Sequence, residues 1–113
     1  MFSQQASAIP VEMFAGVVRR TLSWGERTLL VELSMAAGSD IPWHSHLHEQ
    51  IGYVVRGRFL LDIWEECREV KATDSYLVLS GVSHRVRTLE DTVVVDIFSP
   101  VREDYLPPEA GKR

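Results

Sequence analysis

The most informative stretch of this chain runs from position 38 to position 57 and reads GSDIPWHSHLHEQIGYVVRG. Three of the four histidines in the chain fall within five positions of this stretch, at His44, His46 and His48. Residues two apart in extended backbone point to the same side, so His44 and His46 present two imidazole rings together. That spacing suits adjacent coordination sites of a transition metal. The stretch therefore predicts a metal site beside a strand.

Two further residues complete the expected ligand set. Gln50 lies four residues after His46 and faces the same way if the extended geometry continues. The fourth histidine, His84, belongs to another expected strand. We expect His44, His46, Gln50 and His84 to hold a divalent transition metal, with nickel, zinc, manganese and iron as the candidates. Because these ligands are neutral, the bound ion should polarise a substrate oxygen strongly.

Outward from this stretch, the apolar residues follow the pattern of short β-strands. Runs with period-two alternation or continuous apolar character recur at 16–21, 28–35, 51–56, 58–64, 68–71, 75–79, 84–88 and 92–98, with turn residues between them. About eight such strands close most economically as a barrel or a double-sheet jelly roll, which leaves a cavity between the sheets. We expect one all-β domain over 1–113, with its barrel at about 10–106 and a flexible tail over 107–113.

Size and charge exclude several classes of protein. A chain of 113 residues with 12 basic and 16 acidic side chains fits one compact domain and offers no basic patch for nucleic acid. The apolar runs are far shorter than the roughly 20 residues that cross a bilayer, and no secretory signal opens the chain, so we expect a cytoplasmic protein without a membrane partner. An exposed jelly-roll edge is readily covered by a second copy, so we also expect a homodimer.

A second group of candidate residues lies at the last expected strand. Asp96 and Phe98 share one face of this strand, and Arg102 follows the proline that ends it. A carboxylate on the inward face is costly unless it is paired or used. In one interpretation Asp96 forms a structural ion pair with Arg102 or Arg85, and Phe98 belongs to the core. In the other, Asp96 is a general acid and base, Arg102 binds a substrate carboxylate and Phe98 walls the pocket.

Three other side chains are weighed as pocket residues. His48 has the parity to face the metal, but it lies in a turn-like segment, so we interpret it as a pocket wall. Tyr53 and Tyr76 could each place a hydroxyl group in the cavity, although a strand tyrosine more often packs. Of the two, we include Tyr53 with His48 and Phe98 in the expected substrate pocket.

The spacing of Gly38, His44, His46, Gln50 and Gly57 resembles the first signature motif of the cupin superfamily, with glutamine where the common form has glutamate. Residues 73–84 are similar to the second cupin motif and keep its spacing from glycine to histidine, although a threonine replaces the first glycine of that motif. The resemblance implies a small single-domain jelly-roll barrel with a divalent metal on the four expected ligands.

Residues 44–53 and the C-terminal stretch resemble the pectin-degradation cupins of the KdgF family, which open the ring of 4,5-unsaturated monouronates. The resemblance implies that Asp96, Phe98 and Arg102 line the site beside the metal and that the ligand is a small sugar acid. Two alternatives stay open. One is a metal-dependent dioxygenase or lyase, although Gln50 makes a two-histidine, one-carboxylate iron site less natural. The other is a module that binds a small acid without catalysis.

Overall fold

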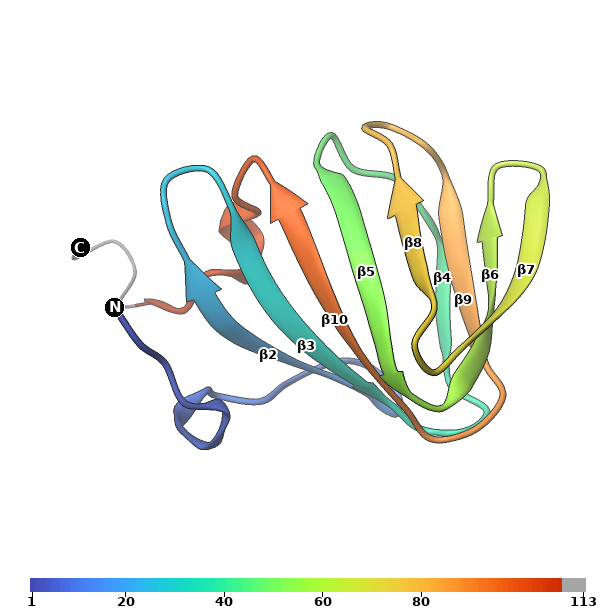
Figure 1. The fold of residues 1–113 in the computed structure, drawn as a ribbon, viewed down its shortest axis with the longest axis horizontal. Helices are drawn as coiled ribbons and strands as arrows, with labels where there is room; N and C mark the ends of the chain where they lie inside the picture. The colour runs from blue at the N-terminus through green and yellow to red at the C-terminus, as the bar shows by residue number, and fades with distance from the viewer. Residues whose placement is uncertain (109–113) are drawn as a thin grey trace.

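The structure, a computed structural model, describes residues 1–108. In this range ten strands form two antiparallel sheets (Figure 1). The six-stranded sheet contains, in spatial order, β1 (Val11–Phe14), β2 (Val17–Trp24), β3 (Leu29–Met35), β10 (Thr92–Ser99), β5 (Glu49–Arg56) and β8 (Ser75–Val78). The four-stranded sheet contains β4 (Asp40–His44), β9 (His84–Thr88), β6 (Arg58–Ile63) and β7 (Glu66–Lys71). Short 3-10 turns cover Gln5–Ser7 and Glu103–Tyr105.

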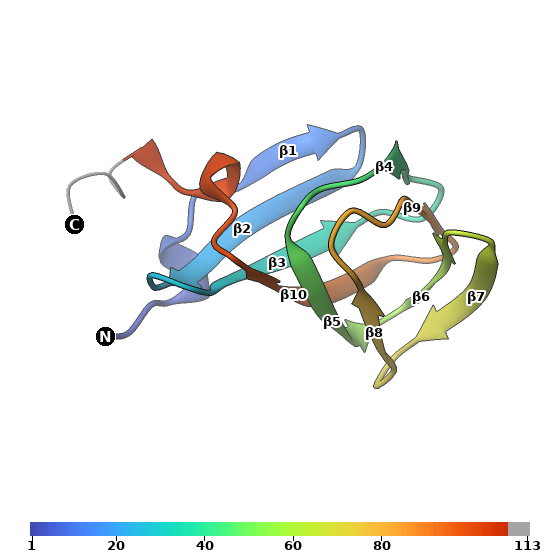
Figure 2. The ribbon, with the colours of Figure 1, turned by 90° about the horizontal axis from the view of Figure 1, so that it is seen from above.

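The core lies between the two sheets. Strand β3 alternates strictly between buried and partly exposed residues, because every second side chain of a strand points to the same face. Val54 and Val94 of the large sheet join Phe59 and Leu61 of the small sheet in one buried cluster. Figures 1 and 2 both show the small sheet at one end of the molecule and the N-terminus at the other. The all-β, two-sheet fold expected from the sequence is confirmed.

The pattern of apolar residues missed two strands. Strand β1 is an edge strand. Because most of its side chains are exposed, its sequence shows little alternation between apolar and polar residues. Strand β4 contains Pro42 and an irregular register opposite β9, which obscures the period-two signal. Of the tail expected over 107–113, only Pro107 and Pro108 lie within the described residues. No helix in the described part of the chain is long and apolar enough to span a membrane.

Four strands from both sheets meet at one end of the interior and bring the candidate residues together. His44 at the end of β4 pairs with His84 at the start of β9. In the large sheet, Gln50 near the start of β5 pairs with Phe98 near the end of β10. This end lies at the top of Figure 1, where the arrow of β10 ends and the loops from β4 to β5 and from β8 to β9 turn.

Candidate functional site

Three histidines converge at this end of the interior. His44, His46 and His84 each offer one ring nitrogen, and these nitrogen atoms all lie within 4.8 Å of one another. The ring centroids of His44 and His84 are 4.1 Å apart, and those of His46 and His84 are 5.0 Å apart. The loop that carries His46 is fixed from the β8–β9 side, because the backbone N–H of Gly81 donates to the His46 carbonyl at 2.8 Å.

Backbone carbonyl groups orient all three rings. The Nδ1 atom of His44 lies 2.7 Å from the Pro42 carbonyl, that of His46 lies 2.9 Å from the His48 carbonyl, and that of His84 lies 2.9 Å from the Val82 carbonyl. A carbonyl oxygen only accepts, so each Nδ1 carries the hydrogen and each Nε2 keeps its lone pair. The three Nε2 atoms are therefore the atoms available to a metal.

Gln50 extends this set with an oxygen. Its Oε1 atom lies 3.2 Å from the Nε2 atom of His46. Its side chain also forms a hydrogen bond with Asp96 that lowers the pKa of this carboxyl group. A hydrogen bond with that effect goes to the carboxylate, which only accepts, so the Gln50 amide nitrogen donates it. One amide thus presents its oxygen to the histidine cluster and its nitrogen to Asp96.

The chemistry of these residues fits a divalent transition metal. Burial lowers the pKa of His44, His46 and His84, that of His84 to about 4, so the rings are neutral at neutral pH. Neutral imidazole is the form that binds a metal. The Nε2 atom of His84 is buried without a hydrogen-bond partner among the described residues, and a bound cation would satisfy it.

Asp96 lies beside the cluster and is only 1% exposed. The Tyr76 hydroxyl donates to its Oδ1 atom at 2.6 Å. Burial raises the pKa of Asp96 from 3.8 to about 6, while hydrogen bonds from Tyr76 and Gln50 and the charge of Arg102 act in the opposite direction. A carboxyl group that titrates near neutral pH is suited to accept and return a proton.

Phe98 and Arg102 close the site from the side of β10. Phe98 is buried and stands edge-on to His46, with ring centroids 5.6 Å apart. The Arg102 guanidinium group lies 3.8 Å from the centroid of the Tyr105 ring and 5.2 Å from that of Phe98. Its Nε and Nη2 atoms contact the two carboxylate oxygens of Asp104 at 3.3 and 3.1 Å. Arg102 is thus stacked on two rings and already holds a carboxylate.

Comparison with known proteins agrees with this geometry. Residues 31–98 match the cupin domain model. The chain is a member of the cupin family. It is KdgF-like within that family, since it is 35% identical over 97 residues to the pectin degradation protein KdgF of Dickeya dadantii (strain 3937), covering 84% of this chain and 88% of the relative.

Two solved structures also resemble this cupin closely. KdgF from Halomonas sp. superimposes with a TM-score of 0.88 at 29% identity, covering 94% of this chain and 98% of that one. An RmlC-like cupin from Shewanella frigidimarina NCIMB 400 superimposes with a TM-score of 0.88 at 28% identity, covering 93% and 95%. The likeness therefore extends over nearly the whole of this cupin.

The structure tests both parts of the structural interpretation of Asp96 and Phe98. Among the described residues of this cupin, Asp96 forms hydrogen bonds with Tyr76 and Gln50. The two arginines form ion pairs with other carboxylates, Arg85 with Asp62 and Arg102 with Asp104. The structural ion pair with Arg102 or Arg85 is therefore not formed. Phe98 does belong to the core, because it lies in a buried cluster with Leu29, Val31 and Tyr105. Sequence reasoning set Tyr76 aside as a packing residue, and the glycine at position 52 was the signal that could have identified it.

The two remaining pocket residues have different positions. The ring centroid of His48 is 5.7 Å from that of His46, and its Nδ1 atom is buried without a hydrogen-bond partner in the described chain. It lies beside the histidine cluster without belonging to it. Tyr53 is 46% exposed on the face of β5 opposite the buried Gln50. The placement of Tyr53 in the pocket is corrected, because its odd position in the alternation of β5 turns it outward.

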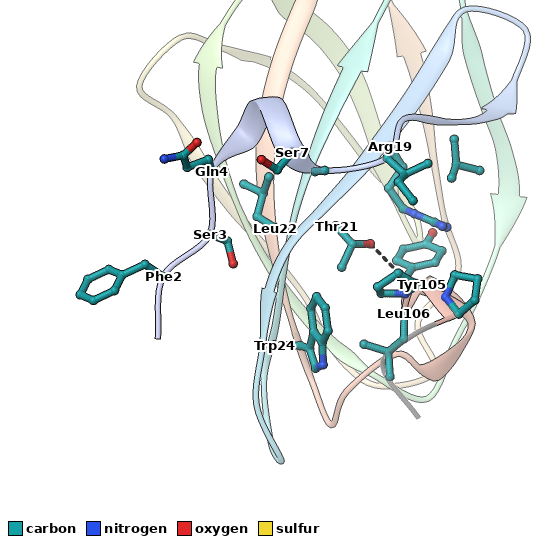
Figure 3. A pocket seen from close by; sticks show the side chains of 15 residues that line it. Phe2, Ser3, Gln4, Ser7, Arg19, Thr21, Leu22, Trp24, Tyr105 and Leu106 are labelled. Carbon is teal, nitrogen blue, oxygen red and sulfur yellow. Dashed lines mark hydrogen bonds between the residues drawn. The ribbon is translucent and has the colours of Figure 1, made fainter. Parts of the chain in front are cut away.

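This cupin also has a separate hollow of about 550 Å³ between its two terminal segments (Figure 3). Trp24, Leu22 and Leu106 line it, and the Arg19 guanidinium group lies 4.3 Å from the centroid of the Tyr105 ring. The described residues that line it include no histidine. Tyr105 separates the two regions, because its ring also packs edge-on against Phe98, with centroids 5.6 Å apart.

Proposed function

We propose that this cupin opens the ring of 4,5-unsaturated monouronates released from pectin or alginate and yields linear keto sugars, with a divalent metal bound to His44, His46, Gln50 and His84. The observation that carries the proposal is Asp96, a buried carboxyl group that hydrogen bonds with one of these four residues. The similarity to KdgF, a pectin degradation protein, supports the same substrate class.

Each residue around the cluster would have a different role toward the substrate. A metal bound at the cluster would polarise a substrate oxygen as a Lewis acid. Arg102 would bind the uronate carboxylate, because a planar guanidinium group holds a carboxylate with two parallel hydrogen bonds. Phe98 and His48 would form the wall beside the histidines. Asp96 is left as the group that moves protons, since its pKa of about 6 lies close to neutral pH.

The reaction balances as an isomerisation. Asp96 accepts the proton of the anomeric hydroxyl group, and the bond between the anomeric carbon and the ring oxygen breaks as the aldehyde forms. The electron pair passes through the resulting enolate to carbon 4, which takes up a proton from Asp96. The ring oxygen becomes the ketone oxygen at carbon 5. One proton leaves an oxygen and one arrives at a carbon, so no oxidant or reductant is consumed.

The test is the loss of the alkene ultraviolet absorbance when metal-analysed protein is mixed with unsaturated galacturonate or mannuronate monomer. We expect turnover by the wild type, and its loss in Asp96→Asn and His84→Ala. Asp40→Asn serves as the matched control, because Asp40 is an exposed aspartate at the start of β4. Absence of wild-type turnover at full metal occupancy would overturn the proposal. Oxygen-uptake and small-acid binding assays would then test the dioxygenase or lyase and the binding-module alternatives.

We further propose that the chain forms a homodimer through the outer face of the large sheet. Ile97 lies in register with Leu30 on β3 and with Ile51 on β5, and Ile51 lies in register with Leu77 on β8. Ile97, Ile51 and Leu77 are each 45–49% exposed. With Tyr53 and Val55 they form a contiguous apolar face, and faces of this kind on a soluble protein mark interaction sites. A cytoplasmic location stays a prediction from the sequence.

A further inference from the structure

Tyr76, Gly52 and Asp96 lie in one row across three neighbouring strands. Gly52 of β5 is the register partner of Tyr76 on β8 and of Asp96 on β10. The two polar side chains therefore belong to strands that are not adjacent, and they meet above the glycine that separates them. The hydrogen bond of 2.6 Å between the Tyr76 hydroxyl and Asp96 Oδ1 spans this gap.

The hydrogen bond between Tyr76 and Asp96 is possible because Gly52 has no side chain. A Cβ atom built at position 52 would lie 2.0 Å from Cζ and 2.3 Å from the hydroxyl oxygen of Tyr76. No side chain can occupy the space that the tyrosine ring takes up. Glycine weakens a strand interior, and its presence there commonly marks a close approach of another group. Here the approaching group is the Tyr76 ring.

The ring itself is held from a second direction. Phe59 of the small sheet stands perpendicular to Tyr76, with ring centroids 5.9 Å apart. Burial and the neighbouring Asp96 raise the pKa of Tyr76 well above its ordinary value, so its hydroxyl group stays protonated and acts as the donor. The ring is thus fixed by Phe59 and Gly52, and its hydroxyl group points at one acceptor.

From this row we infer that Tyr76 is a positioning residue: it reaches over Gly52 and fixes the Asp96 carboxyl group at the edge of the histidine cluster. Tyr76 and Gln50 hold Asp96 between them, and only Gln50 also faces the histidines. Without the tyrosine hydroxyl the carboxyl group keeps one of these two donors and is free to rotate. The role of Asp96 in turnover rests on the proposed function. The hydrogen bond between Tyr76 and Asp96 does not depend on that proposal.

The experiment compares Tyr76→Phe with Tyr53→Phe. The second variant is a matched control, because Tyr53 lies on the outer face of β5 and loses the same hydroxyl group. We expect Tyr76→Phe to lower kcat by about 10- to 100-fold, the effect of a hydrogen bond to a charged group, with KM and metal content near those of the wild type and a melting temperature lowered by a few degrees. Combined with Asp96→Asn, the tyrosine change should cause no further loss. The Asp96 carboxyl carbon resonance of aspartate-labelled protein should shift in Tyr76→Phe and stay in place in Tyr53→Phe.

Each part of the result decides a different point. Full kcat in Tyr76→Phe overturns the positioning role, and so does a loss that persists at full size in the Asp96→Asn background. If the wild type shows no turnover, the proposed function fails. The carbon resonance then decides the inference by itself, and a resonance in Tyr76→Phe identical to that of the wild type overturns it.

Discussion

The Nε2 atom of His46 and the Oε1 atom of Gln50 lie 3.2 Å apart, with a lone pair on each atom. The hydrogen of His46 is on Nδ1, where the His48 carbonyl accepts it. The other end of the Gln50 amide donates to Asp96. A glutamate at this position could serve the first contact but not the second, because it would face Asp96 with another carboxylate. Glutamine is therefore the residue that joins a metal ligand to a buried acid.

Gln50→Glu should separate these two roles. A carboxylate ligand adds charge at the metal, so we expect the variant to bind nickel or zinc at least as tightly as the wild type by calorimetry. Two adjacent carboxyl groups cannot both ionise easily, so Asp96 keeps its proton and ring opening falls by at least about tenfold. Loss of metal with retained turnover per bound metal would contradict this interpretation.

Asp96→Asn should stabilise the metal-free protein in a pH-dependent way. Burial raises the pKa of Asp96 from 3.8 to about 6, so the folded protein binds this proton more tightly than the unfolded chain. The stability from this group is complete below pH 3.8 and is lost as the pH rises through 6, a change of about 3 kcal/mol.

Denaturant unfolding of both proteins between about pH 4 and pH 7 measures this effect. The difference in unfolding free energy, variant minus wild type, should rise by about 2.4 kcal/mol over that range, most of the full change. The histidines titrate in both proteins and cancel in the difference. A difference that does not change with pH would show that Asp96 ionises normally in the folded state.

Asp104→Ala should lower KM for the uronate without changing kcat. Asp104 presents both carboxylate oxygens to Arg102 in the arrangement that a substrate carboxylate would use, and its side chain is 61% exposed. Because the Asp104 side of this pair is open to solvent, its worth is about that of a surface ion pair, up to about 1 kcal/mol, so we expect KM to fall by about fivefold. Glu103→Ala is the control, since Glu103 is an exposed acid beside it. A higher KM would mean that Asp104 holds Arg102 in its binding position.

The sequence predicted the fold because alternation within a strand is a local pattern. It predicted the histidine cluster because the spacings in 38–57 and 73–84 resemble two cupin motifs, although His44 and His84 meet across β4 and β9. Alternation along β3 and β5 is set by the pleat of a strand. His46 lies in the loop between β4 and β5, so this loop, and not the extended geometry expected from the sequence, brings it to Gln50. The sequence did not predict the partner of Asp96, since Tyr76 meets it across an intervening strand and register between strands is not local. Tyr53 was misplaced for a simpler reason. The alternation along β5 puts it on the opposite face from Gln50, and the prediction did not take this into account.

Thr73→Gly should stabilise the protein. Thr73 has a φ of 76° in the turn from β7 to β8, where the Asp74 N–H donates to the Lys71 carbonyl at 2.9 Å. Positive φ at the third residue of such a turn favours glycine, and a β-branched residue there is strained by about 1 kcal/mol. Unfolding free energy should rise by about that amount in Thr73→Gly. Ala72→Gly, one residue earlier, should instead lower it, and equal effects of the two changes would contradict the strain.

Ile97→Arg should convert a dimer into a monomer. Ile97 lies inside the row that runs from Leu30 to Leu77 across four strands, so an arginine there places a charge within the apolar face. A standard interface covers about 800 Å² on each partner, and burying an unpaired charge in such an interface costs several kcal/mol. Light scattering after size-exclusion chromatography should show a wild-type dimer, a monomeric Ile97→Arg, and a dimeric Leu89→Arg, since Leu89 is an exposed leucine outside this row. A dimeric Ile97→Arg would move the interface to a sheet edge, and a monomeric wild type would remove it altogether.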